Sequence, residues 1–208
     1  MSRTSVTTCL IAAVGLALFV SLPARGESAD PATSRISGFY EILLNTMQRG
    51  RQLGLKGRYE KLAPVLSKTY DLVSMARIAV GPSWNGLSAQ QQLEIINAFT
   101  RITVATYASR FDDFSGERFE ISQTVDQPNG DKIVKTRIIQ TNGKTVVLNY
   151  LMRKSGAEWK IVDVYLDGTI SELATRRSEF GAILKSGGPD ALVNLLMRQG
   201  DKLLAERS

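Results

Sequence analysis

Residues 119–168 read FEISQTVDQPNGDKIVKTRIIQTNGKTVVLNYLMRKSGAEWKIVDVYLDG, a segment in which runs rich in β-branched and aromatic residues alternate with short turn-forming groups. These groups are Pro128-Asn129-Gly130-Asp131, Asn142-Gly143 and Ser155-Gly156. Such residues preset φ or accept a positive φ, and Asn-Gly between two β-rich runs is a strong hairpin signal. The segment therefore predicts an antiparallel meander of strands at residues 119–125, 132–141, 144–153 and 158–167.

The turns also predict which residues face each other, because loop length sets strand register. Two-residue loops would place Ile139 opposite Val146 at the second turn, and Leu148 opposite Asp163 at the third. In this register, one face of the sheet is nearly all aliphatic and carries Val134, Ile138, Val147, Leu151, Val162 and Val164. The other face mixes large apolar groups with a few charges, so both faces need cover from helices or from a bound molecule.

Helical periodicity flanks this segment on both sides. Ser88 and Gln91 form a capping box at the start of the longest predicted helix, and Gly54 and Gly187-Gly188 are predicted breaks. The predicted helices are 36–53, 58–66, 70–80, 88–113, 171–185 and a last one that begins at Pro189. The fold class is therefore α+β: a four-stranded antiparallel meander sheet packed with N-terminal and C-terminal helices around an apolar cavity.

The longest predicted helix is apolar over an unusually wide arc, which includes Phe99, Ile102, Tyr107 and Phe111. Such an arc can face a sheet and a cavity at once. The alternative is a helix buried in an ordinary core, and the periodicity fits both.

The N-terminus has the pattern of a secretory signal. Arg3 precedes an apolar run at residues 10–20, and the small-residue pattern Ala24-Arg25-Gly26 follows, so we expect a signal peptide at residues 1–26. A retained membrane anchor is the alternative, although the run is short for a bilayer span. Cleavage would remove the only cysteine, Cys9, and leave a flexible mature N-terminus at residues 27–35 and a single domain at residues 36–208.

Composition excludes several classes of function. The net charge is +6, and without Arg3 and Arg25 the mature chain would keep +4, with no basic cluster of the kind that binds nucleic acid. The chain contains no histidine, which removes the commonest general base and metal ligand. No phosphate-binding loop, dinucleotide signature or calcium-binding loop is present, so we predict neither a cofactor nor a metal site.

Two acidic sites remain. Asp112-Asp113 is predicted to be a polar helix end before the turn at Ser115-Gly116. Asp163 lies mid-strand among valines, and the predicted register places Arg137 on the same face, with both residues flanking Leu148. We expect an ion pair or a shared hydrogen-bond network between Asp163 and Arg137; the alternative is that Asp163 acts as a catalytic base.

Several short motifs, taken in order, resemble the MlaC / toluene-tolerance family of periplasmic lipid-binding proteins. The segment Thr106-Tyr107-Ala108-Ser109-Arg110-Phe111-Asp112 with Ser115-Gly116-Glu117-Arg118-Phe119 is most similar to its hopanoid-associated HpnM branch. The chain departs from the family pattern at Arg176, where an aromatic residue usually precedes the Arg-Ser pair. The other motifs, spread from Tyr59 to Leu203, are Met75-Ala76, Val80-Gly81, Trp84, Tyr150, Gly156, Trp159-Lys160, Asp163-Val164, Asp167-Gly168, Ser171, Arg177-Ser178, Phe180 and Gly187-Gly188.

The resemblance implies a soluble carrier that holds a phospholipid or a hopanoid. Its implied partners are an outer-membrane lipoprotein complex and an inner-membrane ABC transporter with an MCE-type subunit. We expect a monomer, because helices and ligand would cover both faces of the sheet. Arg176 and Arg177 are candidates to meet an anionic head group, with a solvated helix face as the alternative. We expect the lipid tail to contact Phe99, Ile102, Tyr107, Phe111, Val147, Leu151, Val162 and Val164, although each could instead be an ordinary core residue.

Two rival functions fit the same pattern. An α+β fold with a deep pocket could be an isomerase or hydrolase in which Asp163 is the base. Alternatively, the protein could be a module that bridges transporter components and holds no lipid.

Overall fold

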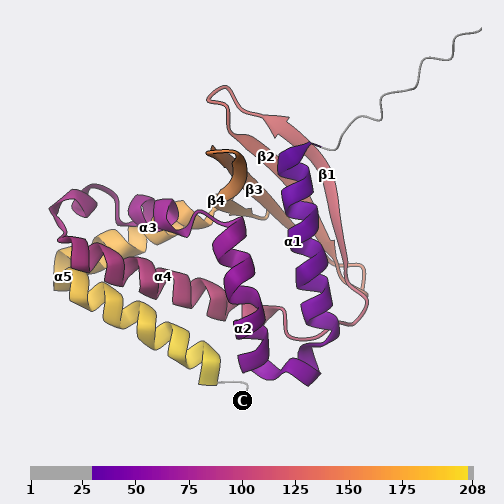
Figure 1. The fold of residues 1–208 in the computed structure, drawn as a ribbon, viewed down its shortest axis with the longest axis horizontal. Coiled ribbons are helices and arrows are strands. Elements are labelled where there is room, and N and C mark those ends of the chain that lie inside the picture. Colours follow the sequence, from indigo (N-terminus) through magenta and orange to yellow (C-terminus); the bar gives the residue numbers. More distant parts are fainter. Residues whose placement is uncertain (1–29, 206–208) are drawn as a thin grey trace, which may run out of the picture.

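The computed structural model describes residues 30–205 as a sheet with helices on one face and beyond one side (Figure 1). The predicted signal peptide lies outside the described residues. No described helix is long and apolar enough to cross a membrane. The elements, in chain order, are α1 (Pro31–Gln48), α2 (Gly50–Thr69), α3 (Leu72–Val80), a short 3-10 helix (Gly81–Gly86), α4 (Ala89–Arg110), β1 (Arg118–Asp126), β2 (Lys132–Ile139), β3 (Thr145–Ser155), β4 (Glu158–Leu166), β5 (Ile170–Ser171) and α5 (Glu172–Ala205).

The sheet is an antiparallel meander in the order β1-β2-β3-β4-β5. The α+β class and the antiparallel sheet agree with the prediction, but the predicted strand number of four was wrong, because β5 adds a fifth strand. This strand has only two residues, Ile170 and Ser171, which pair with the end of β4. A strand this short leaves almost no alternating pattern in the sequence, which explains why it was missed.

The β2–β3 turn is one residue longer than predicted. Gln140 donates its backbone N–H to the carbonyl of Lys144 at 2.8 Å, so three residues, 141–143, form the loop. Gly143 has φ of +81°, as expected for a type I turn followed by a left-handed residue. Ile139 therefore pairs with Thr145 rather than with Val146.

A second register correction applies to β3 and β4. Ser155 pairs with Glu158, so residues 156–157 form the third loop instead of 155–156, and Val162 is an extra residue on β4 between the pairs Leu151–Asp163 and Met152–Ile161. Asp163 therefore pairs with Leu151 rather than with Leu148. A one-residue shift moves a strand's side chains to the opposite face. The extra residue in the β2–β3 turn therefore makes the predicted aliphatic face wrong for β3. Val134 and Ile138 share their face with Val146, Leu148 and Tyr150, while Val147 and Leu151 lie on the other face.

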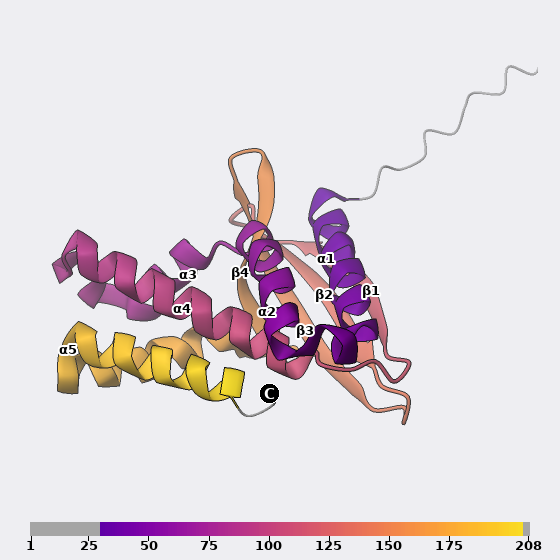
Figure 2. The ribbon, with the colours of Figure 1, turned by 60° about the horizontal axis from the view of Figure 1, so that its bottom comes forward.

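Helices α1 and α2 cover one face of the sheet, and α3, α4 and α5 lie together beyond its side (Figures 1 and 2). Phe39 of α1 is 2% exposed and contacts Tyr150 of β3 edge to face, with ring centroids 6.5 Å apart. Tyr40 of α1 contacts Tyr150 and also Phe119 of β1, at 5.9 Å and 4.8 Å. The aromatic side chains of α1 therefore join the helical layer to the sheet.

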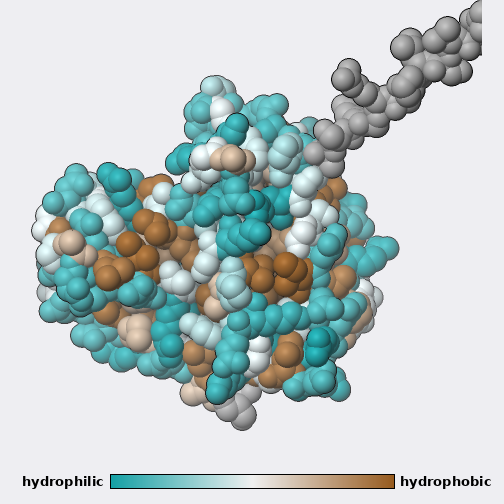
Figure 3. Space-filling view, viewed as in Figure 1, coloured by the Kyte–Doolittle hydropathy of each residue, from teal (hydrophilic) through white to brown (hydrophobic). Residues whose placement is uncertain are grey.

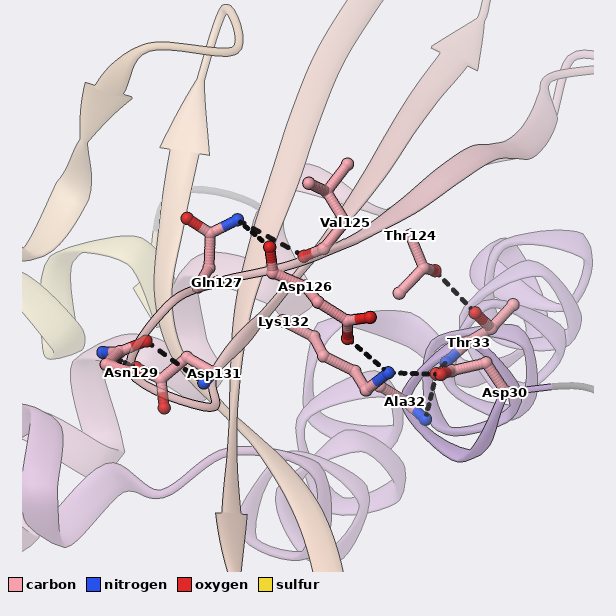
Figure 4. A network of polar contacts seen from close by, with 10 residues as sticks. All are labelled: Asp30, Ala32, Thr33, Thr124, Val125, Asp126, Gln127, Asn129, Asp131 and Lys132. Atoms are coloured by element: carbon pink, nitrogen blue, oxygen red, sulfur yellow. Dashed lines mark hydrogen bonds and ion pairs between the residues drawn. The ribbon is translucent and has the colours of Figure 1, made fainter.

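The first turn of α1 is tied to the β1–β2 hairpin (Figure 4). Asp30 accepts hydrogen bonds from the N–H groups of Ala32 and Thr33, so it caps the helix. Its second carboxylate oxygen lies 2.6 Å from Lys132, which also pairs with Asp126 at 2.7 Å. Helix α1 thus begins at Pro31, five residues before the predicted start at Ile36, because a cap and a lysine from a distant hairpin stabilise its first turn.

The predicted glycine breaks occur inside longer helices. Gly54 in α2 has φ of +59° and Gly188 in α5 has φ of +72°, and the chain resumes helical geometry after each. The capping box of Ser88 and Gln91 is present at the start of α4. Helix α4 is the longest described helix without a non-helical residue, and it lies beside the sheet.

Apolar side chains also reach the surface, in separate patches among hydrophilic residues (Figure 3). One patch covers α3 and the neighbouring part of α4, where Val73 is 55% exposed and Leu93 is 51% exposed. Another lies between α1 and α2. Exposed apolar side chains are common on the surfaces of folded proteins, so these patches need no special explanation.

Candidate functional site

A pocket of about 530 Å³ lies between α4 and the inner face of the sheet. Met47 of α1, Met75 of α3 and Leu173 of α5 also line it, so helices α1, α3, α4 and α5 all contribute to its walls. Its volume falls in the range of small-molecule and cofactor sites. From α4 and the loop after it, the lining residues are Phe99, Ile102, Thr103, Thr106, Tyr107, Arg110, Phe111, Asp112, Asp113, Ser115 and Glu117, and from the sheet they are Ile138, Gln140, Val146, Leu148, Val164 and Leu166.

The pocket is apolar inside and charged at one end. Its buried lining residues are almost all apolar, and each is less than a tenth exposed: Met47, Tyr70, Met75, Phe99, Ile102, Ile138, Leu148, Val164 and Leu173. The charged residues come from the C-terminal end of α4, the loop after it and the first turns of α5; they are Arg110, Asp112, Asp113, Glu117, Glu172 and Arg176. The arrangement suits a ligand with a long apolar part and a polar end.

Most of these charged groups are held by neighbours. Arg51 lies 2.7 Å from Asp113, and its hydrogen bonds lower the pKa of that carboxyl. Glu117 accepts a hydrogen bond from the N–H of Ser115 at 2.7 Å. Arg176 pairs with Glu179 at 3.3 Å. The rim therefore carries both signs of charge and is not a dedicated anion site.

A buried arginine fixes the end of α4 that forms this rim. Arg58, 5% exposed, donates to the carbonyl of Ala108 at 2.8 Å and to the carbonyl of Gly50 at 2.9 Å. Gly50 packs so closely that a Cβ atom there would lie 1.8 Å from the carbonyl oxygen of Asp112. The start of α2 thus positions the Asp112-Asp113 segment, which lies just after α4 rather than at its predicted end, because the helix ends at Arg110.

Tyrosine hydroxyl groups gather at the buried end of the pocket. Tyr70 and Tyr107, which both line the pocket, are hydrogen-bonded to each other through their hydroxyls. Phe39 packs edge to face on both rings, with centroid distances of 5.9 Å and 5.7 Å, and Phe111 stacks on Tyr107 at 5.4 Å. Burial raises the pKa of Tyr70 and of Tyr107 above the ordinary value of 10.0, so both stay neutral.

The structure brings five of the eight predicted contact residues to this pocket: Phe99, Ile102, Tyr107, Phe111 and Val164. It does not bring the other three. Val147 and Leu151 lie on the opposite face of the sheet because of the register shift, and Val162 is the buried bulge residue. Contact between the first five and a lipid tail stays a prediction.

Sequence reasoning also missed several lining residues. Val146 and Leu148 alternate with the wrongly chosen Val147 and Leu151, so the correct hairpin loop length would have identified them. Leu166 lies two residues after Val164, on the same face of β4. Met47 and Met75 carried no local signal, because their helices reach the pocket only through tertiary packing. Arg176 lines the pocket as predicted for a rim residue. Arg177 does not; its guanidinium lies against Gly81.

The predicted pairing of Asp163 with Arg137 was wrong. Arg137 pairs instead with Glu120 on the neighbouring strand, at 2.7 Å. Asp163 is 6% exposed and accepts hydrogen bonds from the N–H groups of Val164 and Leu173 and from the hydroxyl of Ser171, at 2.8, 3.0 and 2.5 Å. It therefore caps the start of α5, and it is not among the residues that line the pocket.

Within residues 30–205, no group of histidine, cysteine, aspartate or glutamate side chains is arranged to hold a metal ion. The buried part of the pocket presents hydroxyl groups and hydrocarbon, and its charged groups lie at the rim. Such a site can shelter an apolar molecule.

Comparisons with known proteins agree with this geometry. No curated protein matches the chain. A solved structure of a phospholipid-binding protein from Ralstonia solanacearum, in complex with a phospholipid, matches with a TM-score of 0.74 and 22% sequence identity, over 84% of this chain and 99% of that chain. At this identity, the likeness shows a shared fold. The family described as MlaC protein matches residues 39–198. Because this match covers well over half of the chain, the protein belongs to the MlaC family.

Proposed function

We propose that this protein is a periplasmic carrier that shelters the apolar part of a lipid in its pocket and moves the lipid between the outer and inner membranes. The observation that carries the proposal is a pocket of about 530 Å³ whose buried lining is almost all apolar, in a chain of the MlaC family. The similarly folded protein from Ralstonia solanacearum was solved with a phospholipid, which supports a lipid as the ligand class.

The physical need for such a pocket is large. A chain of ~16 carbons exposed to water costs about 0.8 kcal/mol per methylene, or about 13 kcal/mol in total. Spontaneous transfer between membranes is therefore slow. A protein that buries the chain between α4 and the sheet lowers this cost.

The lipid is a phospholipid or a hopanoid under this proposal. The family and the phospholipid-bound neighbour favour a phospholipid. The sequence segment from Thr106 to Phe119, which resembles the HpnM branch, favours a hopanoid. Both share a long apolar body, which the buried lining suits equally well.

The proposed partners follow from the family resemblance. An outer-membrane lipoprotein complex and an inner-membrane ABC transporter with an MCE-type subunit would exchange lipid with the carrier. The predicted signal peptide at residues 1–26 supports a periplasmic location, and we expect the mature protein to be a monomer.

The alternative function as an isomerase or hydrolase would need Asp163 in the pocket as its base. Asp163 accepts three hydrogen bonds at the start of α5 and is not a lining residue. The bridging rival predicts that the pocket holds no lipid, and this difference provides the test.

Mass spectrometry of organic extracts, made from protein purified without detergent, is the first experiment. The carrier proposal predicts one lipid molecule per protein. A pocket-filling variant, Val164→Phe, should lose most of this lipid, because Val164 lies in the pocket wall. The matched control is Val147→Phe, which adds the same atoms to the outer face of the sheet and should keep the lipid.

Three outcomes are informative. Stoichiometric lipid that Val164→Phe removes and Val147→Phe keeps supports the carrier. Lipid that both variants retain places the ligand elsewhere and contradicts the proposed site. A lipid-free wild type, purified from cells that make both phospholipids and hopanoids, supports the bridging function instead.

A further inference from the structure

Five hydroxyl groups lie close together at the buried end of the pocket, those of Tyr40, Tyr70, Tyr107, Thr136 and Tyr150, and of these residues Tyr70 and Tyr107 line the pocket. Thr136 donates its hydroxyl proton to the carbonyl of Leu148. Tyr40, 2.5 Å from the Thr136 hydroxyl, must therefore be the donor in that bond. The protons of Thr136 and Tyr40 are both used, and their bonds lead away from the pocket.

The Tyr70–Tyr107 pair is different. A bond between two hydroxyls uses one of their two protons. The other proton can go to the nearby Tyr150 hydroxyl or to a bound molecule, because both residues of the pair line the pocket. The pair thus offers the pocket one donor and several lone pairs.

Tyr150 adds a third hydroxyl beside this pair. Its side chain is fully buried, at 0% exposure, and its hydroxyl makes no hydrogen bond of ordinary geometry. The hydroxyls of Tyr40, Tyr70 and Tyr107 are close enough that, together with burial, they raise the pKa of Tyr150. Buried polar groups in folded proteins are nearly always paired, so an unpaired one calls for a missing partner.

The chemistry of that partner is limited by the surroundings. The charged lining residues lie at the rim, and the tyrosines around the buried end stay neutral. An ionised phosphate, carboxylate or ammonium would be poorly solvated there. A neutral oxygen that both accepts and donates suits the site, because it can take the free proton of the Tyr70–Tyr107 pair.

We propose that the Tyr70–Tyr107 pair, with Tyr150 next to it, binds a neutral hydroxyl group at the buried end of the lipid. This inference rests on the proposed carrier function and narrows its ligand class. The favoured ligand has an apolar body with a hydroxyl at the end that enters the pocket first. A plain hydrocarbon end leaves the tyrosine protons unpaired, and sites built to bond a hydroxyl discriminate against analogues without one.

Two pairs of ligands test the proposal, each on one skeleton with and without the hydroxyl. The polycyclic pair is diplopterol and diploptene, and the linear pair is ω-hydroxypalmitate and palmitate. Lipid-stripped full-length mature protein is incubated with an equimolar mixture of one pair and repurified, and the bound lipids are quantified by mass spectrometry. We expect about tenfold enrichment of the hydroxylated member in at least one pair, which corresponds to about 1.4 kcal/mol.

Phenylalanine variants show whether the tyrosines cause the enrichment. Tyr107→Phe and Tyr70→Phe should each reduce it to less than about twofold, by removing one hydroxyl of the pair. Tyr150→Phe should reduce it while leaving the melting temperature of the lipid-free protein unchanged or higher, because it removes an unpaired buried hydroxyl. Tyr165→Phe removes a hydroxyl from a residue whose side chain lies on the opposite face of the sheet from Tyr150, and it should change nothing.

The outcomes separate the two proposals. Enrichment in the polycyclic pair alone identifies a hydroxylated triterpenoid, and enrichment in the linear pair alone identifies a hydroxylated acyl chain. Equal binding of both members in both pairs overturns the hydroxyl site and leaves the carrier function standing. Enrichment that all three pocket variants retain also overturns it. Binding of none of the four lipids overturns the hydroxyl site, and the carrier function is then decided by the lipid extracted from the protein purified without detergent.

Discussion

Replacing Asp163 tests whether this buried acid serves the fold or chemistry. One carboxylate oxygen, Oδ1, accepts the backbone N–H groups of Val164 and Leu173, and the other, Oδ2, accepts the Ser171 hydroxyl. Asp163→Ala would remove all three acceptors. Asp163→Asn would keep the carbonyl oxygen that both N–H groups need.

The expected size of the effect follows from these contacts. Two buried backbone N–H groups left without partners cost about 1–3 kcal/mol each, and the start of α5 also loses its cap. We expect Asp163→Ala to lower the free energy of unfolding by about 3–5 kcal/mol, and Asp163→Asn by about 1–2 kcal/mol. For a domain of this size, about 4 kcal/mol corresponds to a fall of roughly 10 °C in melting temperature.

Thermal unfolding of lipid-stripped protein, followed by circular dichroism, measures this directly. Asp190, an exposed residue of α5, provides the matched control, and Asp190→Ala should change the free energy of unfolding by less than about 0.5 kcal/mol. The reasoning is refuted if Asp163→Ala is as stable as Asp190→Ala. It is also refuted if Asp163→Asn keeps its stability but loses a measured turnover, which would make Asp163 catalytic.

Three further predictions concern the supports of the pocket and sheet. Gly50→Ala should destabilise the fold by about 2–4 kcal/mol in urea unfolding, because its Cβ would lie 1.8 Å from the Asp112 carbonyl oxygen, whereas Gly86→Ala, with nothing near, should not. Lys132→Met should speed hydrogen exchange in the first turn of α1, because it removes the ion pair to Asp30; unchanged exchange there would show that the Asp30 cap suffices alone. Arg153 hydrogen-bonds to Asp131 and lowers the pKa of that carboxyl below 3.8. A lowered folded-state pKa stabilises the fold above the unfolded-state pKa, and this contribution is lost as pH falls through the folded-state value. Arg153→Gln should therefore cost about 1 kcal/mol at pH 7, and its difference from wild type should shrink below about pH 4, so a difference that stays constant down to pH 2 would contradict the pairing.

Part of this fold could be predicted from local residue patterns. The capping box of Ser88 and Gln91 and the glycine breaks at Gly54 and Gly188 occur where predicted, and each hairpin turn contains its predicted glycine, although the second and third loops differ from the predicted ones by a residue. Each depends on φ preferences or on bonds between residues close in the chain, and these are present in the sequence whatever the rest of the molecule does.

The lining of the pocket was predicted only where helix periodicity suffices. Phe99, Ile102, Tyr107 and Phe111 share one face of α4, and all four reach the pocket. On β3, the turn has three residues where the Asn-Gly pair predicted two, and this difference moved Val147 and Leu151 out and Val146 and Leu148 in. A strand has a side-chain period of two, so an error of one residue reverses its faces, whereas on a helix such an error only rotates the pattern by part of a turn.

Tertiary structure alone decided the partners of the buried polar groups. Asp163 was placed correctly in a strand, yet its acceptors are used by the start of α5, because the short strand β5 brings Ser171 and Leu173 against it. The tyrosines come from α2's end, α4 and β3, far apart in the chain, and meet only because helices cover the inner face of the sheet. Hydrogen bonds and cavities depend on distances of a few tenths of an ångström between such distant segments, and residue order alone does not specify those distances.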